Sequence, residues 1–483
     1  MEFMKLNSLF HGLDVVIKGD GEKKITGICG SSKHVAPGHL FIAKKGREFN
    51  GANFIKEAFK QGAAAVLTDT YYPFLKITQV IYSDLASLEV VLASRYYNFP
   101  SNKLCLIGIT GTNGKTTTAY LLHDLLSTKQ SCCGLMSTID TVIGTHRFPS
   151  VLTTPDLLSN YRFLHEMVLL GAQYAVMEVS SHALDQGRVQ GLDFDVGIFT
   201  NLGRDHLDYH VTSQAYLEAK AKLFALLQSP HHLAVINQDD QAASYIISHS
   251  FCPIITYGMH KQAMVRFENA QLTLDGTEFE VIYHDHRFLI QTSLIGYFNI
   301  FNCLAAMSVA LSKGLTVEEI QKKLRHFKGV PGRLEKIPNS KGIHLFVDFA
   351  HTPEAMREVL QTLHQLKQGK IITIFGCGGN RDRGKRAQMA RAAEKFSDYV
   401  IITSDNPRFE DPVDICQEVA VACDFKRCFI EIDRKKAIQR GIVMAEQGDI
   451  VCIAGRGAER FQNIAGSMIP FDDRNVAREI CFH

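Results

Sequence analysis

The chain has 483 residues, of which 46% are hydrophobic and 21% are charged, a composition typical of a globular protein with several domains. Because 52 Lys and Arg stand against 50 Asp and Glu, the net charge of +2 indicates no nucleic-acid or acidic membrane partner. No apolar run reaches the roughly 18 residues of a membrane span, and charges interrupt the N-terminus too early for a signal peptide. We therefore expect a cytoplasmic protein.

The 12 cysteines lack paired spacing: there is no CxxC motif, and Cys132 and Cys133 are adjacent. Most lie in or beside apolar runs, where cysteine behaves as a small hydrophobic residue. Residues 165–169 (HEMVL) lack the second histidine of a zinc-protease helix. We expect reduced core thiols, and no metal bound through thiols or paired imidazoles.

The first hundred residues predict a small mixed α/β domain that ends at the polar stretch 98–103. Beyond it, apolar runs alternate with helical patterns, which is typical of parallel strands joined by crossover helices. A first set of strands is expected at 104–109, 174–179, 196–199 and 233–236, followed by short β-hairpins within 263–294. A second set is expected at 345–349, 371–375, 399–403 and 450–454, after the turn-rich stretch 329–342.

The sequence thus predicts an α/β protein of three domains. An N-terminal mixed α/β domain spans 1–102, and a central domain with a parallel sheet of the P-loop ATPase type spans 103–330. A Rossmann-like α/β domain spans 331–483.

The strongest local motif is TGTNGKTT at 110–117, between an expected strand and a helical pattern. Its small residues let backbone N–H groups face a phosphate at a helix N-terminus, Lys115 reaches the outer phosphates, and the Thr116 hydroxyl suits Mg²⁺. Ile109 stands where the general pattern has glycine, so the loop belongs to a subclass with Gly111 inside it. These residues predict nucleotide binding but do not distinguish ATP from GTP.

Two neighbouring segments offer metal ligands. Glu178 ends an expected parallel strand, at the sheet edge where α/β proteins bind ligands. The stretch NLGRDHLDYH at 201–210 leaves the next strand and offers His206 and His210. Each could be a hydrogen-bonded loop residue, but together beside a phosphate-binding loop they indicate a metal site.

In the helical pattern 213–227, Lys220 falls on the apolar stripe with Tyr216 and Leu223, whereas Lys222 points away. A buried ammonium group is costly unless it is paired or neutralised. Lys220 is therefore either a snorkelling or salt-bridged side chain, or a functional group that must change its charge beside a metal ion.

The ordered motifs TGTNGKTT, EVSSH, NLGRDHLDYH, YLEAKAKLF, GYFNIFNCLAA, VPGRLE, DFAHTPE and GCGGNRDRGKR resemble those of the Mur ligase family over nearly the whole chain. The resemblance implies that ATP phosphorylates a carboxylate, and that an amine attacks the acyl phosphate to give an amide, ADP and phosphate. It also implies that Glu178 and Thr116 serve a first Mg²⁺, while His206 and Lys220, carbamylated to N6-carboxylysine, serve a second. By the same resemblance, the expected catalytic residues are Lys115, Glu178, His206 and Lys220.

The resemblance further assigns the nucleotide contacts, which are Gly111, Thr112, Asn113, Gly114, Lys115, Thr116, Thr117, Asn299, Asn302, Arg333, Asp348 and His351. The segment 31–46 is similar to the stretch that receives the uridine nucleotide in members acting on UDP-N-acetylmuramoyl-L-alanyl-D-glutamate. Ser32 is the retained serine, although it could instead cap a turn; Ser31 and Lys33 depart from the pattern. Contacts to the muramoyl-dipeptide are expected from Thr153, Thr154, Ser180, Gln186 and Arg188.

Three strand ends of the last domain carry GCGGNRD, DNPR and GRGAE and predict one pocket. It holds Arg381, Asp405, Asn406, Pro407, Arg408, Gly455 and Glu459. Acids suit an ammonium group and arginines suit carboxylates, so a zwitterionic amino acid is expected. DNPR resembles the tetrad of members that add meso-2,6-diaminopimelate, with Arg408 clamping the distal carboxylate. Arg456 and Ala458 depart from the family's GKGHE.

We therefore expect a monomeric ligase of peptidoglycan synthesis that adds meso-2,6-diaminopimelate to the UDP-linked dipeptide. Two alternatives stay open. A ligase resembling folylpolyglutamate synthetase shares the phosphate loop but not the uridine-like segment or DNPR. A nucleotide-dependent regulatory protein would retain the loop without ligase chemistry.

Overall fold

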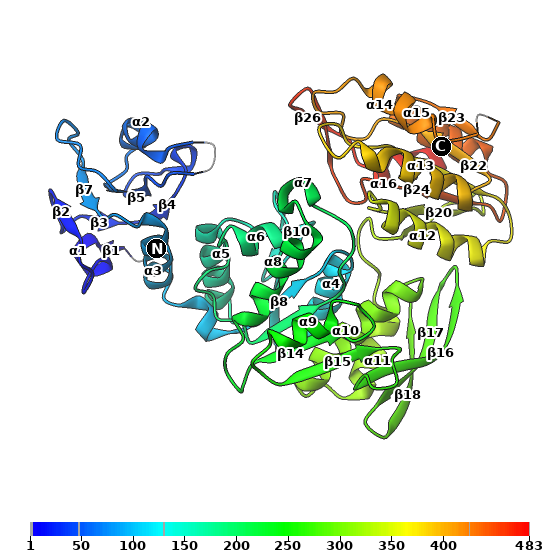
Figure 1. Cartoon of the computed structure of the whole chain (residues 1–483), viewed down its shortest axis with the longest axis horizontal. Coiled ribbons are helices and arrows are strands. Elements are labelled where there is room, and N and C mark those ends of the chain that lie inside the picture. The colour runs from blue at the N-terminus through cyan, green and yellow to red at the C-terminus, as the bar shows by residue number, and fades with distance from the viewer. Residues whose placement is uncertain (1–2, 47–48, 129–130, 425, 483) are drawn as a thin grey trace.

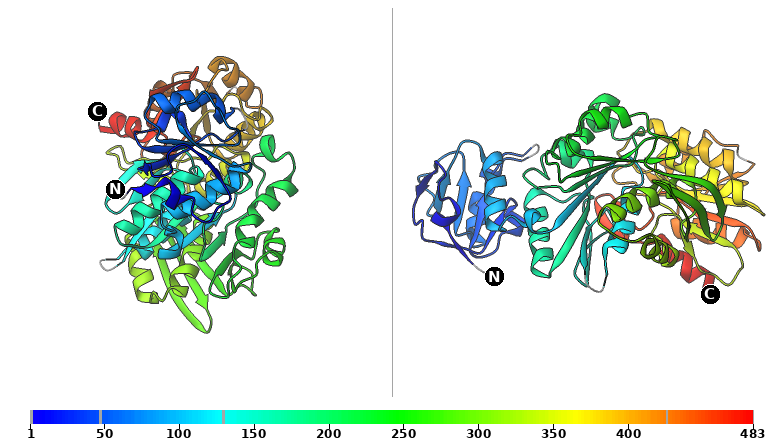
Figure 2. Two further views of the ribbon diagram at one scale, coloured as in Figure 1. Left: turned by 90° about the vertical axis from the view of Figure 1, so that its left-hand side faces the viewer. Right: turned by 90° about the horizontal axis from the view of Figure 1, so that it is seen from below.

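The computed structural model describes residues 3–46, 49–128, 131–424 and 426–482, and it is mixed α/β throughout, which confirms the predicted fold class. Its three larger sheets follow one another along the chain (Figure 1). The N-terminal sheet lies at one end of the molecule, and the C-terminal sheet lies beside the middle one (Figure 2). In the described part of the chain, no helix is long and apolar enough to cross a membrane. The 12 cysteines are free thiols and most are buried, as expected.

The N-terminal sheet has five strands. Its neighbouring strands pair in parallel, except that β2 and β7 are antiparallel. In sheet order they are β2 (Val16–Lys18), β7 (Thr78–Ile81), β6 (Ala65–Thr68), β5 (His39–Ile42) and β4 (Gly27–Cys29). Around it lie β1 (Met4–Lys5), β3 (Lys24–Ile25), α1 (Leu6–Leu9), α2 (Ile55–Lys60) and α3 (Leu85–Tyr96). Helix α3 shares one hydrophobic core with the middle region, where Ser94 Oγ donates to the Tyr161 hydroxyl at 3.0 Å. This core joins the first domain to α5 (Leu157–Leu169).

The middle sheet has 11 strands, with parallel strands at its centre and antiparallel strands at both edges. In sheet order they are β11 (His146–Pro149), β10 (Asp140–Ile143), β9 (Cys132–Met136), β12 (Ala172–Glu178), β8 (Cys105–Thr110), β13 (Val196–Phe199), β14 (Leu233–Asn237), β15 (Ile254–Gly258), β16 (Val265–Thr273), β17 (Gly276–Tyr283) and β18 (His286–Thr292). The hairpins predicted within 263–294 are thus three long strands that continue this sheet. Period-two patterning reveals such strands but not the sheet that they join.

Helices cover both faces of the middle sheet. They are α4 (Lys115–Leu126), α5, α6 (Ser181–Asp185), α7 (Leu207–His210), α8 (Ser213–Ala225), α9 (Ala243–Ser248), α10 (Tyr297–Ser312) and α11 (Val317–His326). Helix α8 begins where the Thr212 side chain accepts a hydrogen bond from Ala215 N. Helix α10 is buried along most of its length because its sequence is apolar on nearly every face, and it packs against α4. The phosphate-loop helix is therefore held from behind.

The C-terminal sheet has six strands, of which only the β19–β20 pair is antiparallel among those described. In sheet order they are β19 (Glu335–Ile337), β20 (His344–Val347), β24 (Ile450–Ile453), β21 (Ile371–Phe375), β22 (Tyr399–Ile402) and β23 (Cys428–Ile430). The flanking elements are α12 (Pro353–Leu366), α13 (Gly384–Phe396), α14 (Pro412–Ala420), α15 (Arg434–Met444), α16 (Asp473–Phe482) and a hairpin of β25 (Phe461–Ile464) and β26 (Ser467–Pro470). The carboxyl ends of β20, β21, β22 and β24 therefore share one edge.

A buried ion pair supports this edge. Arg434 and Asp473 are 1% and 0% exposed and lie 2.7 Å apart. Arg434 also donates through Nη1 to the Ser404 carbonyl and through Nη2 to the Ala454 carbonyl. One guanidinium group thus ties the residues after β22 and β24 to the start of α16.

Replacing Arg434 with Met should destabilise this region by about 3–5 kcal/mol, because the carboxylate of Asp473 would stay buried without its partner. The measurement is the urea midpoint of the full chain, together with hydrogen exchange of β22 and β24. The double variant Arg434→Met/Asp473→Leu should recover part of the loss. A single variant as stable as the wild type would contradict this role for the pair.

Candidate functional site

The phosphate loop lies between β8 and α4 in a conformation that needs two glycines. Gly111 has a φ of +152°, and a Cβ there would stand 1.8 Å from Thr200 Oγ1. Gly114 has a φ of +84°, and its Cβ would stand 2.4 Å from Asn302 Oδ1. Lys115 Nζ donates to the carbonyls of Gly111 and Thr112, both at 2.8 Å, so the ammonium group folds back over the loop. Burial lowers the pKa of Lys115.

The strands on both sides of β8 bring their ends to this loop, because Glu178 pairs with Ile109 and Phe199 pairs with Thr110. The Glu178 carboxylate is fully buried. Its Oε1 accepts from Thr138 N at 2.7 Å and its Oε2 from the Thr138 hydroxyl at 3.0 Å. Thr138, which follows β9, therefore fixes the acid beside the loop.

His206 lies at the mouth of the site in a left-handed backbone conformation, with a φ of 54°. Burial lowers the pKa of His206 to about 4, against the opposing effect of Asp205, whose carboxylate lies 3.3 Å from Nε2. A neutral imidazole is the form that binds metals. His210, the other candidate in this segment, is turned away, with its Nε2 2.9 Å from Ser181 Oγ.

Lys220 is 1% exposed, so its predicted position on the apolar face of α8 is confirmed. Its Nζ donates to the Gly111 carbonyl at 2.8 Å and lies 4.1 Å from the centre of the Tyr216 ring. Among the described residues, no carboxylate forms an ion pair with it. Burial, followed by the charge of Lys115, lowers the pKa of Lys220 well below its ordinary value. The snorkelling and salt-bridge interpretations are both wrong.

The two later domains meet at Arg333, which precedes β19. Its Nη2 donates to the Thr116 hydroxyl at 3.1 Å, and its guanidinium lies 4.2 Å from the centre of the Phe349 ring. Asp348 accepts from Leu334 N and from Ala350 N, and His351 Nδ1 lies 2.9 Å from the Phe349 carbonyl. The segment after β20 thus faces the phosphate loop. Asn299 and Asn302, joined by a 3.0 Å hydrogen bond, lie buried beneath the loop.

Between these domains lies a pocket of about 390 Å³. Its lining includes eight predicted residues, namely His206, His351, Arg381, Asp405, Asn406, Arg408, Gly455 and Glu459. The structure therefore brings the ends of β21, β22 and β24 together as the sequence predicted, and sets them opposite His206. The roles of these residues stay predictions.

Two predicted arginines, Arg381 and Arg408, are among the cations that line the pocket. Arg408 is half-buried, and its Nη1 donates to the Gly379 carbonyl at 2.6 Å. Burial and the nearby Arg381 lower the pKa of Arg408. Neither arginine forms an ion pair with a described carboxylate, so both are available to an anion. Arg408 has a φ of 52°, a conformation that costs a non-glycine residue about 1–2 kcal/mol. It is held there by Asn463 O, which accepts from Arg408 N at 3.0 Å.

Two predicted acids, Asp405 and Glu459, also line the pocket. Asp405 follows β22 and accepts from Asn406 N at 2.6 Å, while Asn406 Nδ2 donates to Glu459 Oε2 at 2.8 Å. Gly455 has a φ of 110°, and a Cβ there would stand 2.9 Å from Asp405 Oδ2. The Pro407 carbonyl approaches Gly379, where a Cβ would lie 2.0 Å away. The backbone of these loops therefore packs too closely for side chains.

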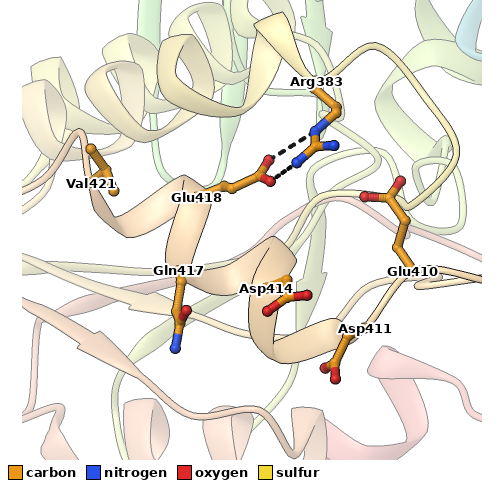
Figure 3. A pocket seen from close by; sticks show the side chains of 7 residues that line it. All are labelled: Arg383, Glu410, Asp411, Asp414, Gln417, Glu418 and Val421. Atoms are coloured by element: carbon orange, nitrogen blue, oxygen red, sulfur yellow. Dashed lines mark hydrogen bonds and ion pairs between the residues drawn. The ribbon is translucent and has the colours of Figure 1, made fainter.

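Behind the pocket, Arg386 holds two of its loops together. It is 2% exposed, and it pairs with Glu410 at 2.8 Å and with Glu418 at 2.6 Å. Glu410 also accepts from Asn380 N, which joins the loop after β21 to the DNPR loop. Figure 3 shows Arg383 pointing to Glu418 in a separate pocket whose lining is mostly acidic.

The residues expected to contact the dipeptide form a connected group around Glu178. Thr154 Oγ1 donates to the Glu178 carbonyl at 2.8 Å and lies 3.3 Å from Ser180 Oγ. Arg188 donates to Gln186 and to the Thr154 carbonyl, and Thr153 Oγ1 lies 3.1 Å from Thr138 Oγ1. Ser32 lies elsewhere, buried in the short helix η1 (Ser32–His34) of the N-terminal domain.

Sequence reasoning missed several residues at this site. His182, Asp205, Phe349 and Lys385 line the pocket. Each stands inside a motif that was noted, but the motif gave no reason to choose it over its neighbours. Thr138 had no sequence signal, since only the turn after β9 brings it to Glu178.

The described residues contain no group of three His, Cys, Asp or Glu side chains placed to hold a metal ion. The donors near the phosphate loop are instead the Thr116 hydroxyl, the Glu178 carboxylate and the neutral His206. A set with few protein ligands suits Mg²⁺, which keeps several waters and takes substrate phosphates as further ligands.

Three family models cover the chain. The Mur ligase middle domain matches residues 109–310, the Mur ligase glutamate ligase domain matches 332–457, and the Mur ligase family catalytic domain matches 24–87. With these matches and relatives that align along its full length, the chain belongs to the Mur ligase family.

Two similar relatives are named UDP-N-acetylmuramoyl-L-alanyl-D-glutamate–2,6-diaminopimelate ligase. The protein of Caldanaerobacter subterraneus subsp. tengcongensis is 38% identical over 482 residues, covering 99% of each chain. That of Chlamydia pneumoniae is 39% identical over 481 residues, again covering 99% of each. A solved structure with the same name has 32% identity and a TM-score of 0.69, and the match covers 100% of this chain and 99% of that one.

Replacing Gly111 with Ala should weaken nucleotide binding at least about ten-fold, because the new Cβ would overlap Thr200 and push the loop out of shape. Equilibrium binding of a fluorescent ATP analogue would measure it. Gly314→Ala is the matched control, since Gly314 also has a positive φ but a Cβ there meets nothing within 4 Å. Equal binding by both variants would contradict the prediction.

Proposed function

We propose that this protein uses ATP to join meso-2,6-diaminopimelate to UDP-N-acetylmuramoyl-L-alanyl-D-glutamate in peptidoglycan synthesis. One observation carries the proposal: Arg381 and Arg408, which pair with no described carboxylate, line the same pocket as the acids Asp405 and Glu459, together with His206. The full-length relatives that carry this activity in their names support it. The products are the UDP-linked tripeptide, ADP and phosphate.

The central domain is proposed to hold ATP. Backbone N–H groups of the loop 111–117 would receive the phosphates, and Lys115 would leave its two carbonyl partners to reach the transferred group. Arg333 and the segment 348–351 would complete the nucleotide site from the C-terminal domain. Positioning and charge neutralisation are the main needs of phosphoryl transfer, so the chain needs no covalent nucleophile.

Mg²⁺ is proposed near Thr116 and Glu178, with a second ion near His206 and Lys220. When bound, these ions would neutralise charge on the phosphates. Lys220 is proposed to carry a carbamate. Its amine is buried beside Tyr216, no described carboxylate pairs with it, and carbamylation by CO₂ would turn the amine into an oxygen ligand. Glu178, already held by Thr138, is positioned without needing to move.

The C-terminal pocket is proposed to select the amino acid. Arg408 and Arg381 would bind the distal carboxylate of diaminopimelate, while Asp405 and Glu459 would receive its ammonium group. L-Lysine lacks that carboxylate, so its binding would leave the arginine fork unpaired. An unpaired buried charge of this kind costs about 2–5 kcal/mol.

The UDP-linked dipeptide is proposed to span the first two domains. Ser32 would lie at the uridine end, and the group around Thr154, Ser180 and Arg188 would hold the peptide near Glu178. We propose domain boundaries at 1–102, 103–330 and 331–483, and a monomer. Because both nucleotide substrates are intracellular metabolites, we place the protein in the cytoplasm.

The wild-type protein should prefer diaminopimelate to L-lysine by about thirty-fold or more in kcat/KM, and Arg408→Ala should remove most of that preference. Mass measurement of the tripeptide product and ADP release would report it. Arg391→Ala, an exposed arginine on α13, is the control and should keep the wild-type ratio. A wild-type preference for lysine would reject the assignment of Arg408.

Lys220→Ala should lower activity on the order of 10²–10³-fold, and a small added carboxylic acid should restore part of it. Lys222→Ala, whose side chain is exposed and bonded to Asp185, should stay within about two-fold of the wild type. A carbamate carbon signal after growth in ¹³C-bicarbonate provides a readout independent of activity. No rescue and no such signal would refute the carbamate.

A further inference from the structure

Arg456 lies beneath the amino-acid pocket, in the loop after β24, and the proposed function gives it no role. Its side chain is 1% exposed. Its Nη2 donates to the Phe461 carbonyl at 2.8 Å and to the Phe471 carbonyl at 3.2 Å. Its Nε and Nη1 have no hydrogen-bond partner in the described part of the chain. Buried donors without partners are costly, so two of them on one side chain call for an explanation.

The acid next to Arg456 is Glu459, which forms part of the pocket wall. Arg456 Nε lies 3.6 Å from Glu459 Oε2, and Glu459 N donates to the Arg456 carbonyl at 3.0 Å, which closes a tight turn. Glu459 Oε2 also accepts from Asn406, while Oε1 accepts no hydrogen bond from a described residue. The cation is thus behind the carboxylate, and one carboxylate oxygen is free for a ligand.

Glu459 needs such support because of the charges around it. Asp405 faces it from the end of β22, and burial and this like charge raise the pKa of Glu459. Arg456 on its own loop and Arg434 on α15 oppose the rise. The charges of Arg408 and Arg333 also reach Glu459 across the pocket. Of these cations, Arg434 already pairs with Asp473, whereas Arg408 and Arg333 are proposed to bind substrates.

We infer that Arg456 is a positioning residue, which holds the Glu459 carboxylate toward the ammonium group of the incoming amino acid. The inference rests on the proposed function, because it assigns Glu459 to that group. An arginine suits the task since its planar fork binds two carbonyls through Nη2 while Nε faces the acid. The family pattern GKGHE has lysine at this position. Lysine would offer a single nitrogen for both the carbonyls and the Glu459 carboxylate.

The test is steady-state kinetics of Arg456→Met and Arg456→Lys over a range of pH, with each of the three substrates varied in turn. Arg456→Met should raise the KM for diaminopimelate about ten-fold, while kcat and the KM of ATP and of the UDP-linked dipeptide stay within about two-fold. Removing the cation raises the pKa of Glu459 further. On the acidic side of the pH profile, the variant should therefore lose activity at a higher pH than the wild type does. Arg456→Lys should lie between, and Arg391→Met should match the wild type.

A double-mutant cycle decides whether Arg456 acts through Glu459. In the Glu459→Gln background, Arg456→Met should change the KM for diaminopimelate less than about two-fold. An equal effect in both backgrounds, or a parallel rise in all three KM values, would overturn the inference and leave a structural role. If Arg456→Met does not fold, the same cycle with Arg456→Lys carries the test. A wild-type protein that forms no amide with any amino acid rejects the proposed function, and this inference with it.

Discussion

The contact between Arg333 and Thr116 is the interaction on which the site depends. It places a cation from the C-terminal side of the domain junction on the hydroxyl at the start of the phosphate-loop helix, 3.1 Å away. The pocket between the two sheets takes His206 from the middle domain and Arg408 from the last, so its shape depends on how the two domains are held together. Catalysis by such an enzyme requires two reactants to be aligned, so the distance between the sheets matters as much as the residues on each.

Asp348 connects the Arg333 contact to the amino-acid pocket. Its carboxylate accepts from Leu334 N, directly after Arg333, and its carbonyl accepts from Gly455 N and Gly457 N in the loop that carries Glu459. The residue therefore joins the linker between the domains to the loop that would bind the amino acid. A movement of the linker that breaks the Thr116 contact would reach that loop directly through the backbone.

The sequence predicted the alternation of strands and helices, the phosphate loop and the convergence of three strand ends, because each follows from short-range patterns with strict geometry. Helical spacing alone placed Lys220 in the core. The sequence could not show that the strands within 263–294 extend the middle sheet, because strand pairing depends on residues far away in the chain. Nor could it show that Thr138 holds Glu178 or that Arg456 is buried, because those contacts arise only once the loops after different strands have packed.

The left-handed backbone of Arg408 limits how the amino-acid preference proposed for it can be transferred to another protein. The β25–β26 hairpin holds the Arg408 backbone in this conformation. The Asn463 carbonyl accepts from Arg408 N, and Ala465 N donates to the Arg408 carbonyl at 2.6 Å. Introducing the four residues DNPR into another protein would therefore transfer the guanidinium group but not its orientation. Transfer of the proposed specificity would have to include the hairpin at 461–470 as well, because that hairpin holds the backbone of Arg408.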